Sequence, residues 1–163
     1  MVIRKMEERD IAGVNKLLKQ VNKIHHDGRP DLFRLANKYT DEELAEKAHN
    51  EIDPVFVAVK DDDSVDPASE DNVLGYAICY FKDTRPDHML TDITGIYIDD
   101  LCVDEKLRGH HIGRMLYDHV CKYAKEKGCY NVTLNVWECN PSAHRFYEAV
   151  GLKPQKYCME HIL

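Results

Sequence analysis

The sequence lacks the features of several large classes of protein. No stretch reaches about 18 apolar residues, the length that a membrane-spanning helix needs. The first ten residues, MVIRKMEERD, hold no apolar core of the kind found in secretory signal peptides. Lysine and arginine form no run, and the formal net charge is −7, which disfavours nucleic acid as a general partner. We therefore predict a cytoplasmic protein that binds neither membranes nor nucleic acid.

Motifs for common cofactors and cross-links are also missing. Neither GxxxxGK[ST] nor GxGxxG occurs, so P-loop and Rossmann nucleotide sites are excluded. None of the six cysteines forms a CxxC pair, and most lie within hydrophobic patterns, which indicates reduced thiols rather than disulfides. The nine histidines include no HxH or HxxxH pair, so we expect no metal site.

What is present is the composition of an ordinary globular chain. Of 163 residues, 44% are hydrophobic and 31% are charged. That length fits one domain, residues 1–163, which can bury a core without metals or cross-links. An acidic surface of this kind favours cationic small molecules or basic peptides as partners.

Hydrophobic periodicity and turn residues predict a mixed series of strands and helices. Helices are expected from about residue 11 to 25, over 41–48 behind a Thr40 to Glu43 capping box, over 112–127 and over 141–150. Strands are expected at residues 2–6, 54–60, 73–82, 95–103, 131–136 and 156–163, with a long exposed hairpin loop at 61–72. Because the two kinds of element do not alternate strictly, we predict an α/β fold of the α+β type, with a mixed sheet flanked by helices.

One stretch joins a strand to a helix through a polar turn, DEKLRGHHIG, at residues 104–113. Such a turn exposes free backbone N–H groups at a helix N-terminus, where the helix dipole also favours an anion such as a pyrophosphate. Arg108 and Arg114 add positive charge, while Gly109 and Gly113 allow close backbone approach. On these residues alone, an ordinary strand-to-helix turn explains the pattern equally well.

Two linked motifs favour the functional interpretation. The run RGHHIG at residues 108–113 resembles the acetyl-CoA motif [RQ]xxGx[GA] of the GNAT superfamily of N-acetyltransferases, with His111 at the position of the middle glycine. About thirty residues downstream, Asn140, Ala143, Tyr147 and the pair Gly151-Leu152 are similar to that superfamily's second signature. The two matches stand in the right order and on the right elements, and together they cover roughly residues 95–152.

The resemblance implies a GNAT-like acyl-CoA N-acyltransferase fold whose central sheet is splayed, with acetyl-CoA as cosubstrate between the strands at 95–103 and 131–136. The backbone of the first strand would pair with the pantetheine arm like an added strand. The cofactor-binding residues that it implies are Leu101, Cys102, Val103, Arg108, Gly109, His110, His111, Ile112, Gly113, Arg114 and Asn140.

Catalytic candidates follow from the same resemblance. The family places a tyrosine at Tyr147 as the acid that protonates the departing thiolate, although a core aromatic is the structural alternative. The strand IYIDDLCV is similar to that of diamine N-acetyltransferases, whose first carboxylate serves as base, which favours Asp99. Simple alternation sends Asp99 and Asp100 to opposite faces, and a salt-bridged pair remains an alternative. Glu138 is a further candidate base, and an acetylated Cys102 a further route.

The predicted function is direct transfer of acetyl from acetyl-CoA to a primary amine, on a small molecule or a peptide. His25, His26 and the following GRPDLF are expected to shape the rim of the acceptor pocket. Two alternatives stay open: a non-catalytic acyl-CoA-binding or sensor module of the same fold, and a protein-interaction domain without a ligand. The sequence does not choose among polyamines, aminated antibiotics, amino acids and protein N-termini, and it leaves assembly into a homodimer open.

Overall fold

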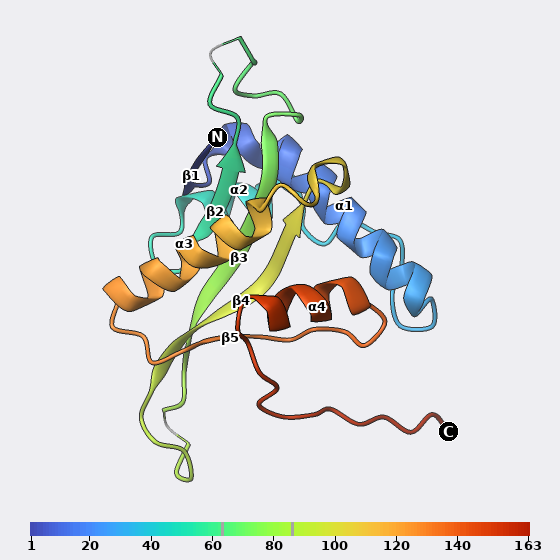
Figure 1. Cartoon of the computed structure of the whole chain (residues 1–163), viewed down its shortest axis with the longest axis vertical. Helices are drawn as coiled ribbons and strands as arrows, with labels where there is room; N and C mark the ends of the chain where they lie inside the picture. Colours follow the sequence, from blue (N-terminus) through green and yellow to red (C-terminus); the bar gives the residue numbers. More distant parts are fainter. Residues whose placement is uncertain (63, 86) are drawn as a thin grey trace.

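The computed structural model describes residues 1–62, 64–85 and 87–163, and it confirms the mixed, splayed sheet flanked by helices (Figure 1). Five strands form one sheet in chain order: β1 (Val2–Lys5), β2 (Val55–Val59), β3 (Val73–Asp83), β4 (Thr94–Val103) and β5 (Val132–Leu134). Neighbouring strands are antiparallel from β1 to β4, and β5 runs parallel to β4. The parallel pair requires a crossover, which is made by the turn and helix between them.

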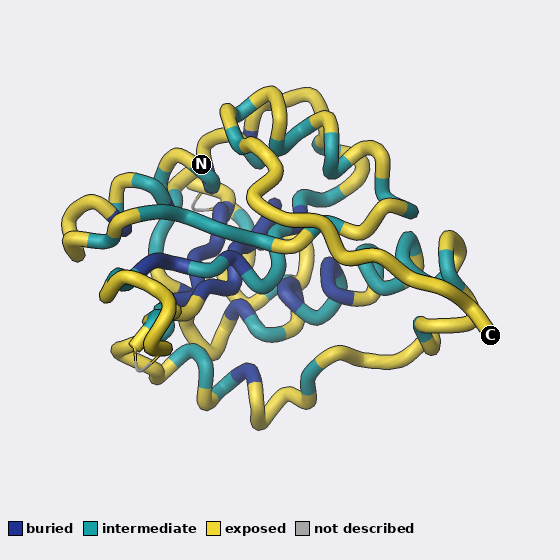
Figure 2. Tube along the Cα trace, turned by 90° about the horizontal axis from the view of Figure 1, so that it is seen from below, coloured by how far each residue is buried: buried dark blue, intermediate teal, exposed yellow. Residues whose placement is uncertain are grey.

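Four α-helices cover the two faces of this sheet: α1 (Ile11–Gly28), α2 (Asp41–His49), α3 (Ile112–Glu126) and α4 (Pro141–Ala149). Strand β2 is buried on both faces, and its side chains alternate between two core clusters. Val57 packs with Leu17 of α1 and Leu44 of α2, whereas Phe56 packs in the cluster that holds Leu116 of α3. Figure 2 shows this core as the dark segments at the centre of the molecule.

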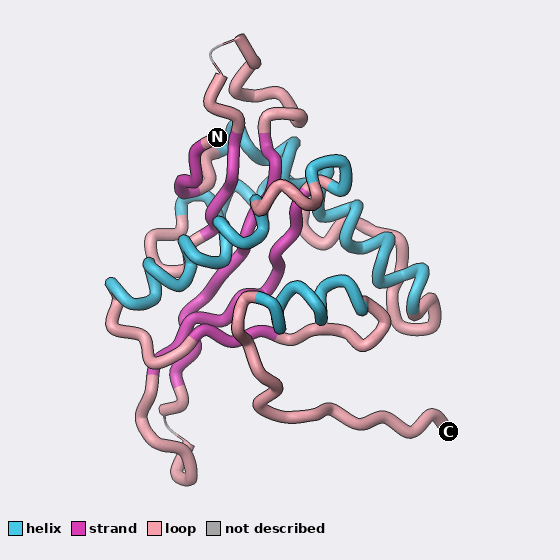
Figure 3. Tube along the Cα trace, viewed as in Figure 1, coloured by secondary structure: helices cyan, strands magenta, loops and turns pink. Residues whose placement is uncertain are grey.

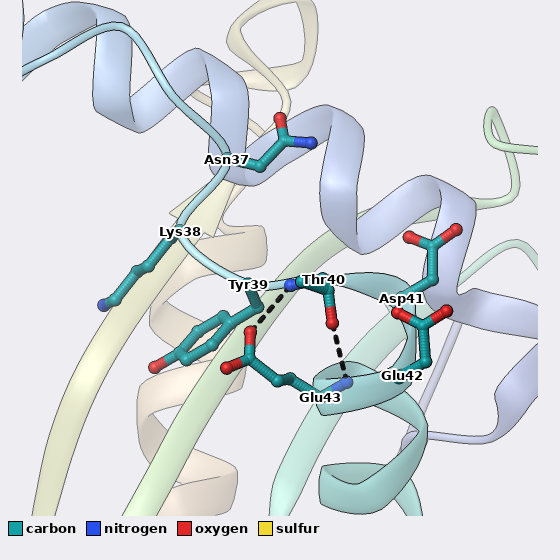
Figure 4. Close-up of a pocket in the computed structure, with 7 residues that line it drawn as sticks. All are labelled: Asn37, Lys38, Tyr39, Thr40, Asp41, Glu42 and Glu43. Carbon is teal, nitrogen blue, oxygen red and sulfur yellow. Dashed lines mark hydrogen bonds between the residues drawn. The ribbon is translucent and has the colours of Figure 1, made fainter.

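Capping residues set the helix ends where the sequence predicted them. The backbone N–H of Glu43 donates to Thr40 Oγ1 at 3.2 Å, and the backbone N–H of Thr40 donates to Glu43 Oε2 at 2.8 Å, which completes the capping box (Figure 4). Gly128 and Gly151, which follow α3 and α4, have φ of 71° and 98°, a left-handed conformation that glycine adopts without strain. These caps explain why the predicted helices agree closely with the observed ones.

The prediction of a last strand at residues 156–163 is wrong. The segment has no strand partner among the described residues and is exposed along its whole length (Figures 2 and 3). A strand is stable only when a neighbour accepts and donates its backbone hydrogen bonds, and the residues of this segment do not by themselves supply that neighbour. The segment is tied to the body by Arg29, whose guanidinium donates to both oxygens of Glu160 at 2.9 and 3.2 Å.

Two other predicted segments differ in smaller ways. The strand expected at 131–136 is only the three residues of β5, because its pairing with β4 ends at Ile98 and Leu134. The loop at 61–72 joins β2 to β3 as predicted, and within it Asp63 lies outside the described residues. Among the described residues, no helix combines the length and apolar character needed to cross a membrane.

Candidate active site

The sheet splays at the middle of β4. Strand β5 pairs with β4 only from Ile96 to Ile98, whereas β3 continues alongside β4 as far as Val103. In the part of the chain that the structure describes, no strand therefore pairs with residues 101–103 on the side of β5. This edge offers backbone donors and acceptors to an extended ligand.

A β-bulge places both carboxylates of β4 on one face, so the prediction of opposite faces is wrong. Across β3, Ile78 faces Asp100 and Cys79 faces Ile98, which leaves Asp99 as the extra residue. Alternation restarts after the bulge, and Ile98 and Leu101 consequently both pack in the core under α3. Asp99 and Asp100 point together toward the side of α1 and α2.

The paired carboxylates hold a lysine from the segment that precedes α2. Lys38 Nζ donates to Asp99 Oδ2 and to Asp100 Oδ2, each at 3.0 Å, and the Tyr39 hydroxyl donates to Asp99 Oδ2 at 2.9 Å. Burial disfavours the charged form of Lys38, but the negative charges of Asp100 and Asp99 outweigh it and raise the pKa of the ammonium. Burial raises the pKa of the Tyr39 hydroxyl to about 12; the positive charge of Lys38 opposes this shift, and the negative charge of Asp99 adds to it.

Lys38 and Tyr39 also border a surface depression of about 360 Å³, lined by residues 37–43 (Figure 4). The side chains of Lys38 and Tyr39 extend from this segment, and their hydrogen bonds to Asp99 place them on the face of β4. The depression therefore lies next to the carboxylate pair, because Lys38 and Tyr39 line the depression and also contact Asp99.

Two tyrosines complete the surroundings of Asp100. Tyr76 of β3 is fully buried, and its hydroxyl has no hydrogen-bond partner among the described residues. Burial first, and then the charge of Asp100, raise the pKa of both Tyr76 and Tyr147 well above the ordinary value for a phenol. The Tyr147 hydroxyl therefore stays protonated and is available as a proton donor.

The turn before α3 presents a row of unused backbone donors. The first helical hydrogen bond runs from the N–H of Met115 to the carbonyl of His111 at 3.0 Å. Within residues 1–62, 64–85 and 87–163, no hydrogen bond uses the N–H groups of residues 109–114. Gly109 has φ of 84° and His111 has φ of 62°, and these left-handed residues fold the turn into a concave shape. Free amides at a helix N-terminus form a site for a phosphate group.

Asn140 and Gln20 make hydrogen bonds to backbone groups near the open edge of β4. Asn140 is the N-cap of α4, where its Oδ1 accepts from the N–H of Ala143 at 3.1 Å. Gln20 of α1 donates from Nε2 to the carbonyl of Val103 at 3.0 Å, and its Oε1 accepts from the N–H of Glu105 at 3.0 Å. Gln20 thus ties α1 to both the strand and the turn.

The other residues that the sequence offers for catalysis, Cys102 and Glu138, have surroundings that suit that role less well. Burial first, and then the charge of Asp100, raise the pKa of Cys102 to about 12, which keeps this thiol protonated and a poor nucleophile. Glu138 is fully exposed, and its carboxylate lies 3.5 Å from His144 Nε2. Among the described residues, no three His, Cys, Asp or Glu side chains group closely enough to hold a metal ion.

Aromatic residues pack together near His25, where the sequence predicts the rim of an acceptor pocket. The rings of His25 and Phe33 lie 5.0 Å apart, and Phe33 meets Trp137 edge to face at 4.9 Å. Trp137 belongs to the loop between β5 and α4, so this contact joins that loop to the segment that follows α1. Burial is the main cause that lowers the pKa of the His25 imidazole. The negative charge of Asp100 opposes this shift, and the positive charge of Lys38 adds to it.

Sequence reasoning missed Lys38, Tyr39, Tyr76 and Gln20. Lys38 and Tyr39 precede a capping box, and nothing local connects them to carboxylates some sixty residues later. Tyr76 reads as an ordinary strand residue. A polar residue on the inner side of α1, such as Gln20, was the one available signal.

Comparisons with known proteins agree with this geometry. The sequence profile of the acetyltransferase (GNAT) family matches residues 19–152. The thialysine N-epsilon-acetyltransferase of Bos taurus is 32% identical over 79 residues, which are 48% of this chain and 44% of that protein. The glucosamine 6-phosphate N-acetyltransferase of Arabidopsis thaliana is 32% identical over 56 residues, 34% of this chain and 36% of that protein. The chain thus matches less than half the length of each of these curated relatives.

Solved structures are similar over nearly the whole chain. A mutant of the BH1408 protein from Bacillus halodurans superposes with a TM-score of 0.90 at 28% identity, covering 100% of this chain and 99% of that chain. The aminoglycoside N-acetyltransferase AAC(6')-Iy, solved in complex with CoA, superposes with a TM-score of 0.68 at 14% identity, covering 99% of this chain and 98% of that chain. At that identity the second likeness shows a shared fold alone.

Proposed function

The chain belongs to the GNAT acetyltransferase family, and on that premise we propose that it transfers the acetyl group of acetyl-CoA directly to a primary amine. The observation that carries the proposal is the open edge of β4, which lies between the free amides of residues 109–114 and the Asp99–Asp100 pair. An acyl donor and a cationic acceptor can meet there from opposite sides.

The donor side fits acetyl-CoA. The amides of residues 109–114, with Arg108 and Arg114, would hold the pyrophosphate, and the backbone of residues 101–103 would pair with the pantetheine arm. Asn140 has its Oδ1 engaged in the cap of α4, so its contact with the arm would come from Nδ2.

The acceptor side fits an ammonium that must lose a proton before attack. Asp99 would take that proton, directly or through a water. The nitrogen then bonds to the acetyl carbon, a backbone N–H of the splayed strand stabilises the oxyanion, and the carbon–sulfur bond breaks. Tyr147 would give its proton to the departing thiolate, and the proton that the nitrogen loses as the amide forms would restore the phenol.

A panel of amines with acetyl-CoA tests the proposal through release of the free CoA thiol. The panel should include thialysine, glucosamine 6-phosphate and an aminoglycoside, since relatives are named for these acceptors, together with a polyamine and a peptide. The rival is a non-catalytic acyl-CoA-binding module, for which acetyl-CoA would bind but no amine would release thiol. Binding without release across the panel would favour that rival.

Asp99→Asn should raise the Michaelis constant for the amine and lower turnover at neutral pH, because the variant neither attracts the ammonium nor accepts its proton. Raising the pH should restore part of the rate, since the free amine no longer needs a base. Steady-state rates against pH measure both effects. Glu138→Gln is the matched control, and a loss in Glu138→Gln with none in Asp99→Asn would move the base to Glu138.

His111→Gly should stabilise the fold and leave acetyl-CoA affinity intact. A non-glycine residue in the left-handed region costs about 1–2 kcal/mol, which the greater freedom of glycine in the unfolded chain partly offsets. A rise in Tm of roughly 2 °C is therefore expected. His111→Ala, which removes the imidazole but keeps the strain, is the control. A tenfold weaker acetyl-CoA affinity in both variants would show that the imidazole contacts the ligand.

We also propose that two copies associate. Tyr157, Met159, Ile162 and Leu163 leave large apolar surfaces on the C-terminal segment, and each of them is at least 73% exposed. Light scattering of the intact chain tests this, and a monomeric mass at micromolar concentration would contradict it.

A further inference from the structure

The acceptor side of the proposed site already holds an ammonium ion. Lys38 Nζ sits between Asp99 and Asp100, 3.0 Å from an oxygen of each. The same nitrogen lies 5.5 Å from the centre of the Tyr39 ring, and the Tyr39 hydroxyl donates to Asp99. Two carboxylates and an aromatic face are the groups that recognise a cationic amine.

The groups around the Lys38 ammonium carry more negative charge than Lys38 alone neutralises, as expected of a site that binds a cationic ligand. The Tyr76 hydroxyl is fully buried beside Asp100, and the charge of that carboxylate adds to the effect of burial in raising the pKa of the phenol. The side chain of Asp100 is only 10% exposed. Two carboxylates against one ammonium also leave one negative charge uncompensated within the cluster formed by Asp99, Asp100 and Lys38.

Lys38 can leave this position. Its side chain is 36% exposed, and it belongs to the irregular segment between α1 and α2 rather than to a helix or strand. Its unbranched chain of four methylene groups extends from the segment at residues 37–43 (Figure 4) and ends at the carboxylates of Asp99 and Asp100. A chain of the same chemistry can follow the same path.

We infer that Lys38 is an internal occupant of the acceptor site, which the acceptor displaces, and that the site takes a primary amine at the end of an unbranched alkyl chain. The inference rests on the proposed function and narrows its acceptor to lysine-like amines. Lys38 is then a specificity-determining residue. It competes with weak ligands and keeps the carboxylate pair neutralised between turnovers.

Lys38→Met tests the inference, because methionine keeps most of the length of the side chain and removes the competing charge. If the lysine fills the site for nine-tenths of the time or more, its removal should lower the Michaelis constant for thialysine about tenfold. Turnover at saturating thialysine should stay within about twofold, since an occupant that has already left has no part in the chemistry. A raised Michaelis constant, or a turnover lost at saturation, would overturn the inference and make Lys38 a residue that positions the pair.

Lys47→Met is the matched control. Lys47 Nζ lies 4.7 Å from the centre of the same Tyr39 ring, but it makes no ion pair with Asp99 or Asp100 among the described residues. This variant removes the same charge from the same neighbourhood, so the Michaelis constant for thialysine should not change. An equal fall in both variants would attribute the effect to general electrostatics and overturn the inference.

A binding measurement separates this inference from the proposed function. Thialysine without acetyl-CoA should raise the Tm of Lys38→Met more than that of the parent, because the freed site binds it more tightly. If no amine releases thiol but this difference is present, the proposed activity fails and the ammonium site stands. If the parent acetylates thialysine but the difference is absent, the activity stands and the inference about Lys38 fails.

Discussion

Tyr147→Phe should lower turnover with the best amine by on the order of 10²-fold or more, while acetyl-CoA binding changes little. The substitution deletes only the hydroxyl and keeps the ring, which packs 5.1 Å from that of Phe146. Burial and Asp100 raise the pKa of this phenol, so it carries its proton at neutral pH and can give it to a thiolate. A proton donated late in the reaction contributes to the transition state rather than to binding of the donor.

Turnover at saturating amine and the Tm shift with acetyl-CoA are the two measurements needed. Tyr123→Phe is the matched control, because it removes the hydroxyl of another half-buried tyrosine, on α3, which packs against Phe56. Parent-like turnover in Tyr147→Phe would make Tyr147 a packing residue. Water, or a group that has not been named, would then be the acid.

Local patterns in the sequence predicted most of the fold. The helix at residues 112–126 follows from its apolar spacing and from the glycine after it, and the capping box at Thr40 follows from two side chains three residues apart. The turn at residues 104–113 could be predicted for the same reason. Its free amides belong to a continuous stretch of chain, so a local motif describes them completely.

The contacts around Asp99 and Asp100 could not be predicted in that way, because they depend on relations between distant segments. The bulge that brings Asp99 and Asp100 to one face is a property of the register between β3 and β4. The ion pairs of Lys38 join residues about sixty positions apart, and no periodicity records such a contact. The unpaired segment at residues 156–163 shows the opposite problem, since the residues of a segment do not record whether a partner strand exists.

Gly113→Glu should abolish most of the stabilisation that acetyl-CoA gives. At a concentration one hundred times its dissociation constant, a ligand that binds only the native state adds about 2.7 kcal/mol. For a chain of this size, that free energy corresponds to a rise in Tm of roughly 5–10 °C. A glutamate in the first turn of α3 would place a carboxylate among the free amides of residues 109–114, where it competes for their N–H groups and repels the pyrophosphate.

Two control variants separate charge from crowding. A β-carbon at residue 113 would lie 3.3 Å from the Phe146 ring, so Gly113→Ala reports the cost of bulk alone and should keep the shift. Lys122→Glu adds negative charge farther along α3 and should also keep it. Thermal unfolding without ligand establishes that each variant folds. If folded Gly113→Glu still shows the full shift with acetyl-CoA, the amides of residues 109–114 do not hold the pyrophosphate, and the donor side of the proposed site must lie elsewhere on the chain.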